Sequence, residues 1–268
     1  MKSLVITPTL GNSPWLAETV ASVAASGVTC HHVLVCPERA RVDLATRFPQ
    51  TQVVTEPGGG MYAAINAGIA AAASEWDAFT YINDDDLLLP GFNAGVRMVE
   101  RAPGAPLIAY GHVKLIDSAG RRLGAIPISP LPSLNRALYA QRIEPVFQQG
   151  TLVSRAAFAA LRGFDTVLRF CGDSEFLARA CIAGVPFVRV GGAPMAAFRL
   201  RAGQLTKDRA AMRAERTQVD LKLGLLAPLS AMTKWKTRIL FRAANLPVYA
   251  ERVARHGFVT FDELVAQA

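Results

Sequence analysis

Cysteine is scarce in this chain of 268 residues, which has Cys30, Cys36, Cys171 and Cys181 only. None of them forms a C-x-x-C pair, and no histidine stands at zinc-finger spacing from them. This spacing argues against a zinc finger and favours free thiols in a reducing compartment.

Long apolar runs are also missing. No window approaches the roughly 18 uninterrupted apolar residues of a membrane-spanning helix. The first apolar run, Leu4-Val5-Ile6, stops at Pro8 and is too short for the core of a signal peptide. There is no internal repeat and no low-complexity linker. We therefore expect a cytoplasmic protein, with peripheral contact at the inner face of a membrane left open.

The composition is that of a folded domain, because 51% of the residues are hydrophobic and only 19% are charged. The length suffices for one large α/β domain with a full core. Lys and Arg (29) outnumber Asp and Glu (21), and the net charge of +8 favours contact with polyanions such as nucleotide diphosphates or anionic lipids. No RNA-binding motif accompanies the charge, so we expect no nucleic-acid partner.

Short apolar runs alternate with helical patterns over the first 110 residues, which predicts a mostly parallel, Rossmann-related sheet flanked by helices. The expected strands are 3–7, 33–36, 52–55, 78–82, 107–110 and 186–190. The expected helices are 14–25, with Ser13 as N-cap, and 61–73, 155–161 and 174–183. Turn signals between 111 and 132 predict a hairpin and loop.

An acidic run, Asn83-Asp84-Asp85-Asp86, follows the apolar strand 78–82. Three adjacent carboxylates repel one another unless a cation or solvent relieves them, and Mg²⁺ or Mn²⁺ prefers such oxygen ligands. Ligands of open α/β sheets bind beyond the carboxyl ends of the strands, where this run is expected. A solvated acidic turn is the alternative.

The segment 81–92, Tyr-Ile-Asn-Asp-Asp-Asp-Leu-Leu-Leu-Pro-Gly-Phe, resembles the metal-binding segment of family 2 glycosyltransferases, which have the GT-A fold. The resemblance implies inverting transfer of a sugar from a nucleotide-diphosphate donor, with a UDP-sugar favoured, to a glycan or lipid-linked glycan. It implies Mn²⁺ or Mg²⁺ on Asp85 and Asp86, and a donor contact for Asn83, Asp84 and Asp85.

Further segments resemble the donor side of the same family: 5–12, 56–68 and 198–206. The Gly-rich turn before helix 61–73 suits an anion near a helix N-terminus, although a turn with core-facing side chains is the alternative. The family often has acids where this chain has Gly58 and Ala63, and only Glu38 is acidic after the second strand. The donor-side residues that these segments imply are Thr7, Pro8, Thr9, Glu56, Tyr62, Asn66, Arg199 and Arg201.

The segment 170–179 resembles the family's catalytic segment, in which an aspartate opens a helix and acts as general base. That aspartate is Asp173, and inverting transfer needs one carboxylate to accept the proton of the attacking hydroxyl. An N-cap role is its alternative. Glu175 also stands four residues before Arg179, where a surface ion pair is the default. The residues that the resemblance assigns to the acceptor side are Gln148, Gln149 and Glu175.

The domain plan that follows is a catalytic domain over 1–225, with a nucleotide-binding half (1–110) and an acceptor half (111–225), and a basic helical extension over 226–268. Within the extension, Trp235 and Ile239 would share an apolar face flanked by cations. We expect this helix to pack on the catalytic domain, with membrane contact as the alternative.

Three other functions remain open. A nicotinamide-dependent oxidoreductase would use strand 52–55, the glycines at 58–60 and helix 61–73 as a dinucleotide-binding unit, but the last glycine of the motif is missing. A nucleotidylyltransferase would need a basic loop after the first strand, and 7–13 has none. A non-catalytic nucleotide-sugar or glycan binding module of the same fold is the third.

Overall fold

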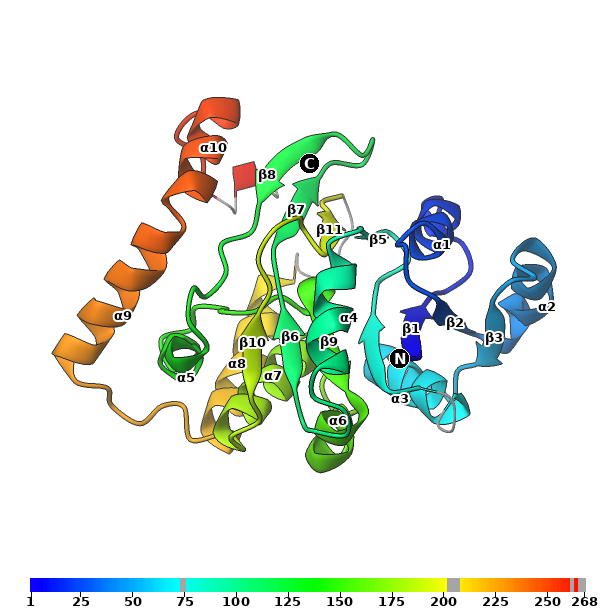
Figure 1. Ribbon diagram of the computed structural model, residues 1–268, viewed down its shortest axis with the longest axis horizontal. Coiled ribbons are helices and arrows are strands. Elements are labelled where there is room, and N and C mark those ends of the chain that lie inside the picture. The colour runs from blue at the N-terminus through cyan, green and yellow to red at the C-terminus, as the bar shows by residue number, and fades with distance from the viewer. Residues whose placement is uncertain (73–75, 202–207, 261–262, 265–268) are drawn as a thin grey trace.

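A computed structural model describes residues 1–72, 76–201, 208–260 and 263–264 (Figure 1). Its strands form two sheets. The larger sheet has seven strands, in the order β10 (Phe187–Arg189), β6 (Ile108–Tyr110), β9 (Thr151–Ser154), β4 (Ala78–Tyr81), β1 (Ser3–Pro8), β2 (Cys30–Cys36) and β3 (Gln52–Thr55). The smaller sheet has four, in the order β5 (Leu87–Leu88), β11 (Ala196–Arg199), β7 (Val113–Ile116) and β8 (Arg122–Ala125).

The larger sheet is mostly parallel, because β1 runs parallel to β2 and β4, and only β9 is antiparallel to its neighbours. Side chains of a strand alternate between the two faces. Leu4 and Ile6 accordingly join the core on one face, and Val5 joins the core on the other. Both faces are therefore buried, which explains the apolar run Leu4-Val5-Ile6 at the centre of β1.

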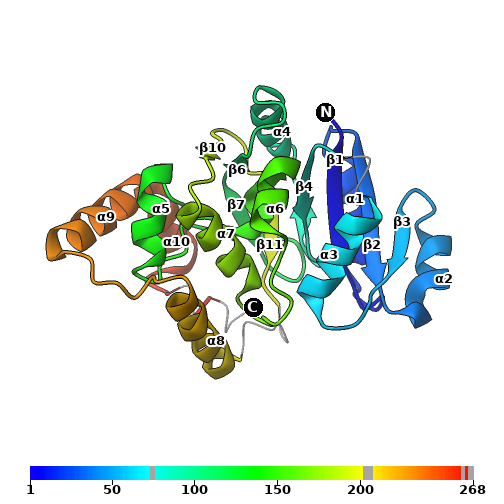
Figure 2. The ribbon, with the colours of Figure 1, turned by 90° about the horizontal axis from the view of Figure 1, so that it is seen from below.

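Helices cover the two faces. On one face lie α3 (Met61–Ala71), α6 (Arg155–Leu161) and α7 (Gly172–Ile182), seen toward the viewer in Figure 2. On the other lie α1 (Leu16–Ala24) and α4 (Phe92–Glu100). The remaining helices are α2 (Glu38–Arg47), α5 (Asn135–Tyr139), α8 (Arg209–Lys222), α9 (Ala231–Ala244) and α10 (Leu246–His256), with short 3₁₀ turns at Pro132–Leu134 and Gln148–Gly150.

The predicted strands are all present with small shifts of their ends, and helix 155–161 has the predicted bounds. The hairpin predicted after residue 111 is the antiparallel pair of β7 and β8. The predicted start of the first helix was wrong, because α1 begins at Leu16 and Trp15 is its N-cap. The Ser13 hydroxyl instead donates to the Asp84 carbonyl at 2.8 Å.

Three helices escaped prediction: α2, α4 and the short α5. In α2 only Leu44 is buried, so the apolar periodicity that reveals a helix is missing. In α4 the core-facing residues Phe92, Val96 and Val99 do stand at helical spacing. That signal was present in the sequence directly after Pro90-Gly91 and was missed.

The order of the strands disfavours the dinucleotide-binding unit. Such a unit joins two neighbouring parallel strands through a helix. Here α3 leads from β3, at the edge of the larger sheet, to β4, and both β1 and β2 lie between these strands. The glycines before α3 therefore do not open a unit of this kind.

Candidate active site

The acidic run joins the two sheets. It leaves β4 after Tyr81 and enters β5 at Leu87, so Asp84, Asp85 and Asp86 lie beyond the carboxyl end of β4, as the sequence predicted. Their side chains take different partners. The Thr9 hydroxyl donates to Asp84 at 2.6 Å, and Arg201 forms an ion pair with Asp85.

Asp86 is the buried member of the run and has no exposed surface. One of its oxygens accepts from the Arg199 backbone N–H at 2.8 Å, and the other accepts from Asn83 at 3.1 Å and from Gln149 at 3.3 Å. Burial, and then the charge of Asp85, raises the pKa of Asp86 well above its usual range. Both oxygens of Asp86 thus accept hydrogen bonds inside the protein, and the expectation that Asp86 holds a metal stays a prediction.

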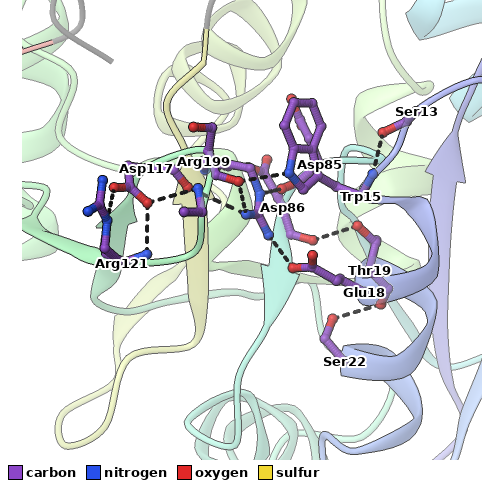
Figure 3. Close-up of polar contacts among 12 residues, drawn as sticks. Ser13, Trp15, Glu18, Thr19, Ser22, Asp85, Asp86, Asp117, Arg121 and Arg199 are labelled. Carbon is purple, nitrogen blue, oxygen red and sulfur yellow. Dashed lines mark hydrogen bonds and ion pairs between the residues drawn. The ribbon is translucent and has the colours of Figure 1, made fainter.

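Arg199 ties the same network to α1 and to the β7–β8 hairpin (Figure 3). Its guanidinium is fully buried and donates to the Asp85 carbonyl at 2.7 Å, to the Ser118 carbonyl at 3.1 Å and to the Glu18 carboxylate at 2.6 Å. The expected contact of Arg199 with a donor diphosphate is thus contradicted, since its donors are used inside the protein. The backbone carbonyls and Glu18 compensate its buried charge.

Asp85 forms an ion pair with Arg201, and Arg201 is the more exposed of the two. The Arg201 side chain is 28% exposed and the Asp85 side chain 5%. Arg199, in β11, and Arg201, two residues later, both lie over the Trp15 ring, with each guanidinium carbon 5.5 Å from the ring centre. Of the two arginines, Arg201 is therefore the one placed to meet a ligand.

Asp173 lies in the first turn of α7. It is not the N-cap, because Cys171 holds that position. The Ser174 N–H donates to its carboxylate at 2.8 Å, and the Tyr62 hydroxyl lies 3.3 Å from the same oxygen. Burial, and then the charge of Glu144, raises the pKa of Asp173 to about 6. A carboxylate whose pKa is raised toward neutral pH is suited to accept a proton.

A small cavity of about 10 Å³ adjoins Asp173, at the lower limit for one water molecule. Tyr81 and Gln148 line it together with Phe164 and Phe176. Burial raises the pKa of the Tyr81 hydroxyl well above its usual range, and the charges of Asp173 and Asp86 add to this effect. Gln148 lines this cavity and the next residue, Gln149, donates to Asp86, so two adjacent residues contact the Asp173 cavity and the acidic run.

Tyr62 and Asn66 of α3 do point the same way, as predicted, but toward the protein. Asn66 donates to the Phe164 carbonyl at 2.9 Å and accepts from the Phe164 N–H at 3.1 Å. The Tyr62 ring stacks on Phe164 at 5.8 Å. Both side chains thus hold the segment that leads to Asp173, and the expected donor contact of Asn66 is replaced by this brace.

The other predicted donor residues have mixed positions. Thr7 is buried, and its hydroxyl lies 2.9 Å from Nε2 of His32, which excludes the predicted donor contact. Burial lowers the pKa of His32 to about 4, so this ring is neutral and structural, as expected. Pro8 ends β1 half-buried, and Glu56, half-buried, follows β3 with its N–H on the Cys36 carbonyl at 2.8 Å.

The three acceptor-side residues are all buried. Gln148 donates to the Tyr81 carbonyl and Gln149 to Asp86, so both brace the centre of the site. Glu175 has no exposed surface and pairs with Arg179 and Lys222, each at 2.9 Å. The expected surface ion pair of Glu175 is therefore a buried one, and its predicted contact with an acceptor is contradicted.

Sequence reasoning missed the role of α8, which holds the Asp173 segment from outside. The Glu215 carboxylate accepts from three successive backbone N–H groups, those of residues 169, 170 and 171, at 2.6–2.8 Å. Next to it, Arg216 pairs with Glu144 and donates to Ser174 at 2.7 Å. No local motif marks these residues, because their partners lie some 40 to 70 positions earlier in the chain.

Among the described residues, no group of three or more His, Cys, Asp or Glu side chains is arranged to hold a metal ion. The four cysteines are free, as expected. A Mg²⁺ or Mn²⁺ site in this class needs only one or two carboxylates, with phosphate oxygens completing the shell. Of the two predicted metal ligands, Asp85 pairs with Arg201, and Asp86 accepts hydrogen bonds from the Arg199 backbone and from Asn83.

Comparison with known proteins identifies the fold. No family model and no curated protein sequence matches the chain. Among solved structures, S. aureus TarS superposes with a TM-score of 0.60 at 14% identity, over 98% of this chain and 45% of TarS. The fold is GT-A-like.

Two further GT-A-like neighbours were solved with ligands. TarS 1–349 in complex with UDP-GlcNAc gives a TM-score of 0.61 at 14% identity, over 98% of this chain and 78% of that one. GalNAc-T7 with UDP, GalNAc and Mn²⁺ gives 0.55 at 14% identity, over 96% and 58%. The predicted fold class and the resemblance to family 2 glycosyltransferases are thus confirmed as a likeness of fold.

Proposed function

We propose that this chain is an inverting, metal-dependent glycosyltransferase that moves a sugar from a nucleotide-diphosphate donor to a hydroxyl of a glycan or lipid-linked glycan. The observation that carries the proposal is the placement of Asp173, a carboxylate with a pKa of about 6, at a cavity that Tyr81 and Gln148 line, next to Gln149, which donates to Asp86 of the acidic run. The GT-A-like fold supports it, as does the position of the run beyond the carboxyl end of β4.

Asp173 would act as the base. Its carboxylate would accept the proton of the acceptor hydroxyl while that oxygen bonds to the anomeric carbon and the bond to the diphosphate breaks on the opposite face. Tyr62 and Glu215 would position it, since Tyr62 contacts the carboxylate and Glu215 holds the turn before α7. At pH 7 a group with a pKa of about 6 is mostly deprotonated and still basic enough to accept a proton.

Asp85 would hold the divalent ion, together with phosphate oxygens of the donor. The ion would offset the charge that develops on the departing diphosphate. Arg201 would contribute a second positive charge beside the diphosphate, and it competes with the ion for the Asp85 carboxylate, with which it now pairs. Thr9 and Asp84 would line the nucleoside side, because their hydrogen bond joins β1 to the run.

A UDP-sugar is the donor that we favour. UDP-GlcNAc is present in one structure of similar fold, and UDP with GalNAc and Mn²⁺ in another. The donor would occupy the half formed by residues 1–110, which carries Asp85, and the acceptor the half formed by 111–225, which carries Asp173.

Turnover tests the proposal. We expect release of UDP from one UDP-sugar in the presence of Mn²⁺, with a loss of at least about a hundredfold in Asp173→Asn and in Asp85→Asn. Asp43→Asn, on the outer surface of α2, is the matched control and should keep full activity. Transfer that survives both site substitutions would refute the mechanism.

A non-catalytic nucleotide-sugar binding module is the second candidate, and the Arg201–Asp85 pair favours it because it neutralises the carboxylate without a metal. Such a module would gain thermal stability from a UDP-sugar without releasing UDP. It would also gain the same stability with and without Mn²⁺.

A further inference from the structure

The outer face of α9 combines exposed apolar side chains with cations. Met232, Trp235 and Ile239 are 68%, 63% and 43% exposed. At 100° per residue they form one stripe along the helix. Thr237 and Phe241, about half a turn away, are buried. The stripe therefore points away from the protein and has no partner among the described residues.

The orientation of this stripe is fixed. Asn245, at the end of α9, is buried and holds the backbone of Ile128 on both sides, with its oxygen accepting at 3.1 Å and its nitrogen donating at 2.9 Å. The buried side of α9 also contacts α5. Figure 1 shows α9 at one end of the molecule, at the opposite end from α2.

Cations flank the stripe and no acid interrupts it. Lys236 lies on one side, and Arg238 and Arg242 lie on the other. No acidic residue stands between Asp220 and Glu251 in the sequence. Within the described chain none of these three cations forms an ion pair. The face is thus an apolar band between two positive edges, as in helices that lie in an anionic membrane interface.

We infer that α9 docks the protein on an anionic bilayer surface, with Trp235, Met232 and Ile239 entering the headgroup boundary and the cations meeting lipid phosphates. The expectation from the sequence was that this helix packs on the catalytic domain. Such packing accounts for the buried side of α9 and not for its exposed side. A second copy of the chain fits the face poorly, because a two-fold contact would press cations against cations. No described helix is long and apolar enough to span a membrane, so α9 lies on the bilayer rather than crossing it.

Vesicle binding of the full chain tests this docking without any sugar donor, so its outcome is independent of transferase activity. The probes are phosphatidylcholine vesicles with and without 30% phosphatidylserine. We expect binding to the anionic vesicles, and about a hundredfold loss in the triple variant Lys236→Gln, Arg238→Gln, Arg242→Gln, at about fivefold per cation. Trp235→Ser with Ile239→Ser should weaken binding similarly.

The matched control removes three cations from α2: Arg39→Gln, Arg41→Gln and Arg47→Gln. It changes the net charge equally at the far end of the molecule and should lose less than tenfold. Equal losses in both triple variants, or binding that ignores the apolar substitutions, would overturn the docking role of α9. So would a change of oligomeric state in the α9 variants without a change in vesicle binding, because the stripe would then join two copies.

Discussion

Replacement of Asp173 by asparagine should stabilise the fold while it abolishes activity. The carboxyl has a pKa of about 6 in the folded chain, against an ordinary value of 3.8. Above pH 6 the buried charge therefore costs at most about 3 kcal/mol of the free energy of unfolding, at 1.36 kcal/mol per pH unit. Asparagine keeps an oxygen for the N–H of Ser174 and the hydroxyl of Tyr62, so the variant removes the charge and little else.

The pH dependence of the stability gain shows whether the buried charge of Asp173 is its cause. A raised pKa means that the penalty is complete above pH 6, fades as pH falls through 6, and is gone below the ordinary value. Urea unfolding should therefore show Asp173→Asn more stable than the parent by up to about 3 kcal/mol at pH 8, and by about 0.5 kcal/mol at pH 4.

Asp165→Asn is the control with the opposite sign. Lys222 lowers the pKa of Asp165 through a hydrogen bond, so its charge stabilises the fold above its unfolded pKa and that contribution fades as pH falls. Asp165→Asn should cost about 0.5 kcal/mol at pH 8, because the pair is partly exposed. If the difference in free energy of unfolding between Asp173→Asn and the parent were the same at pH 8 and pH 4, Asp173 would not carry a buried charge. The same conclusion would follow if the variant were less stable than the parent at pH 8.

Three further predictions concern the same site. The kcat/KM of the parent should fall about tenfold from pH 7 to pH 5, because a base with a pKa of about 6 becomes protonated. With a base whose pKa is 3.8, kcat/KM would fall by only about 6% over the same range. A flat pH profile from stopped-time assays would reject Asp173 as the base. Glu215→Gln removes the charge and replaces one of the two acceptor oxygens by an amide nitrogen, which cannot accept a hydrogen bond. It should cost about 2 kcal/mol in urea unfolding and lower kcat more than it alters the KM for the donor; an unchanged kcat would deny it a positioning role. Gly172→Ala would put a methyl carbon 2.5 Å from the Tyr62 ring, and should cost about 1–3 kcal/mol with a loss of turnover, measured by thermal unfolding and UDP release; wild-type values would show that the ring yields freely.

The sheet and its order of elements were predictable because burial on both faces leaves a strong pattern. The residues of β1 and β4 are buried apart from the half-buried Pro8, and most of them are apolar. Helix α6 begins after Ser154, whose hydroxyl accepts from the Ala157 N–H as an N-cap should. By contrast, α2 buries one residue and carries no pattern. Strand order across the sheet was also out of reach, because it depends on contacts between distant segments.

The positions of Asp85 after β4 and of Asp173 in the first turn of α7 were predictable, and their partners were not. Asp85 and Asp173 have the predicted positions, since residue type and local context point to them. The burial of Asp86, Arg199 and Glu175 was not predictable, because each is satisfied by a partner more than 40 residues away or on the smaller sheet. A charged residue in a motif looks the same in sequence whether it meets a ligand or a buried counter-charge.

The acidic run that joins the two sheets has a consequence for how this chain tolerates change. Its three aspartates look equivalent in sequence, yet each has a different partner in the structure. The partner is the Thr9 hydroxyl for Asp84, Arg201 for Asp85 and the Arg199 backbone N–H for Asp86. In a saturation library selected only for folding, position 84, which is half-buried, should accept the most residues, and position 85, whose side chain is buried against Arg201, should accept fewer. Position 86 should accept almost none, and it should vary only together with Gln149 and Asn83, because these three share one buried set of hydrogen bonds.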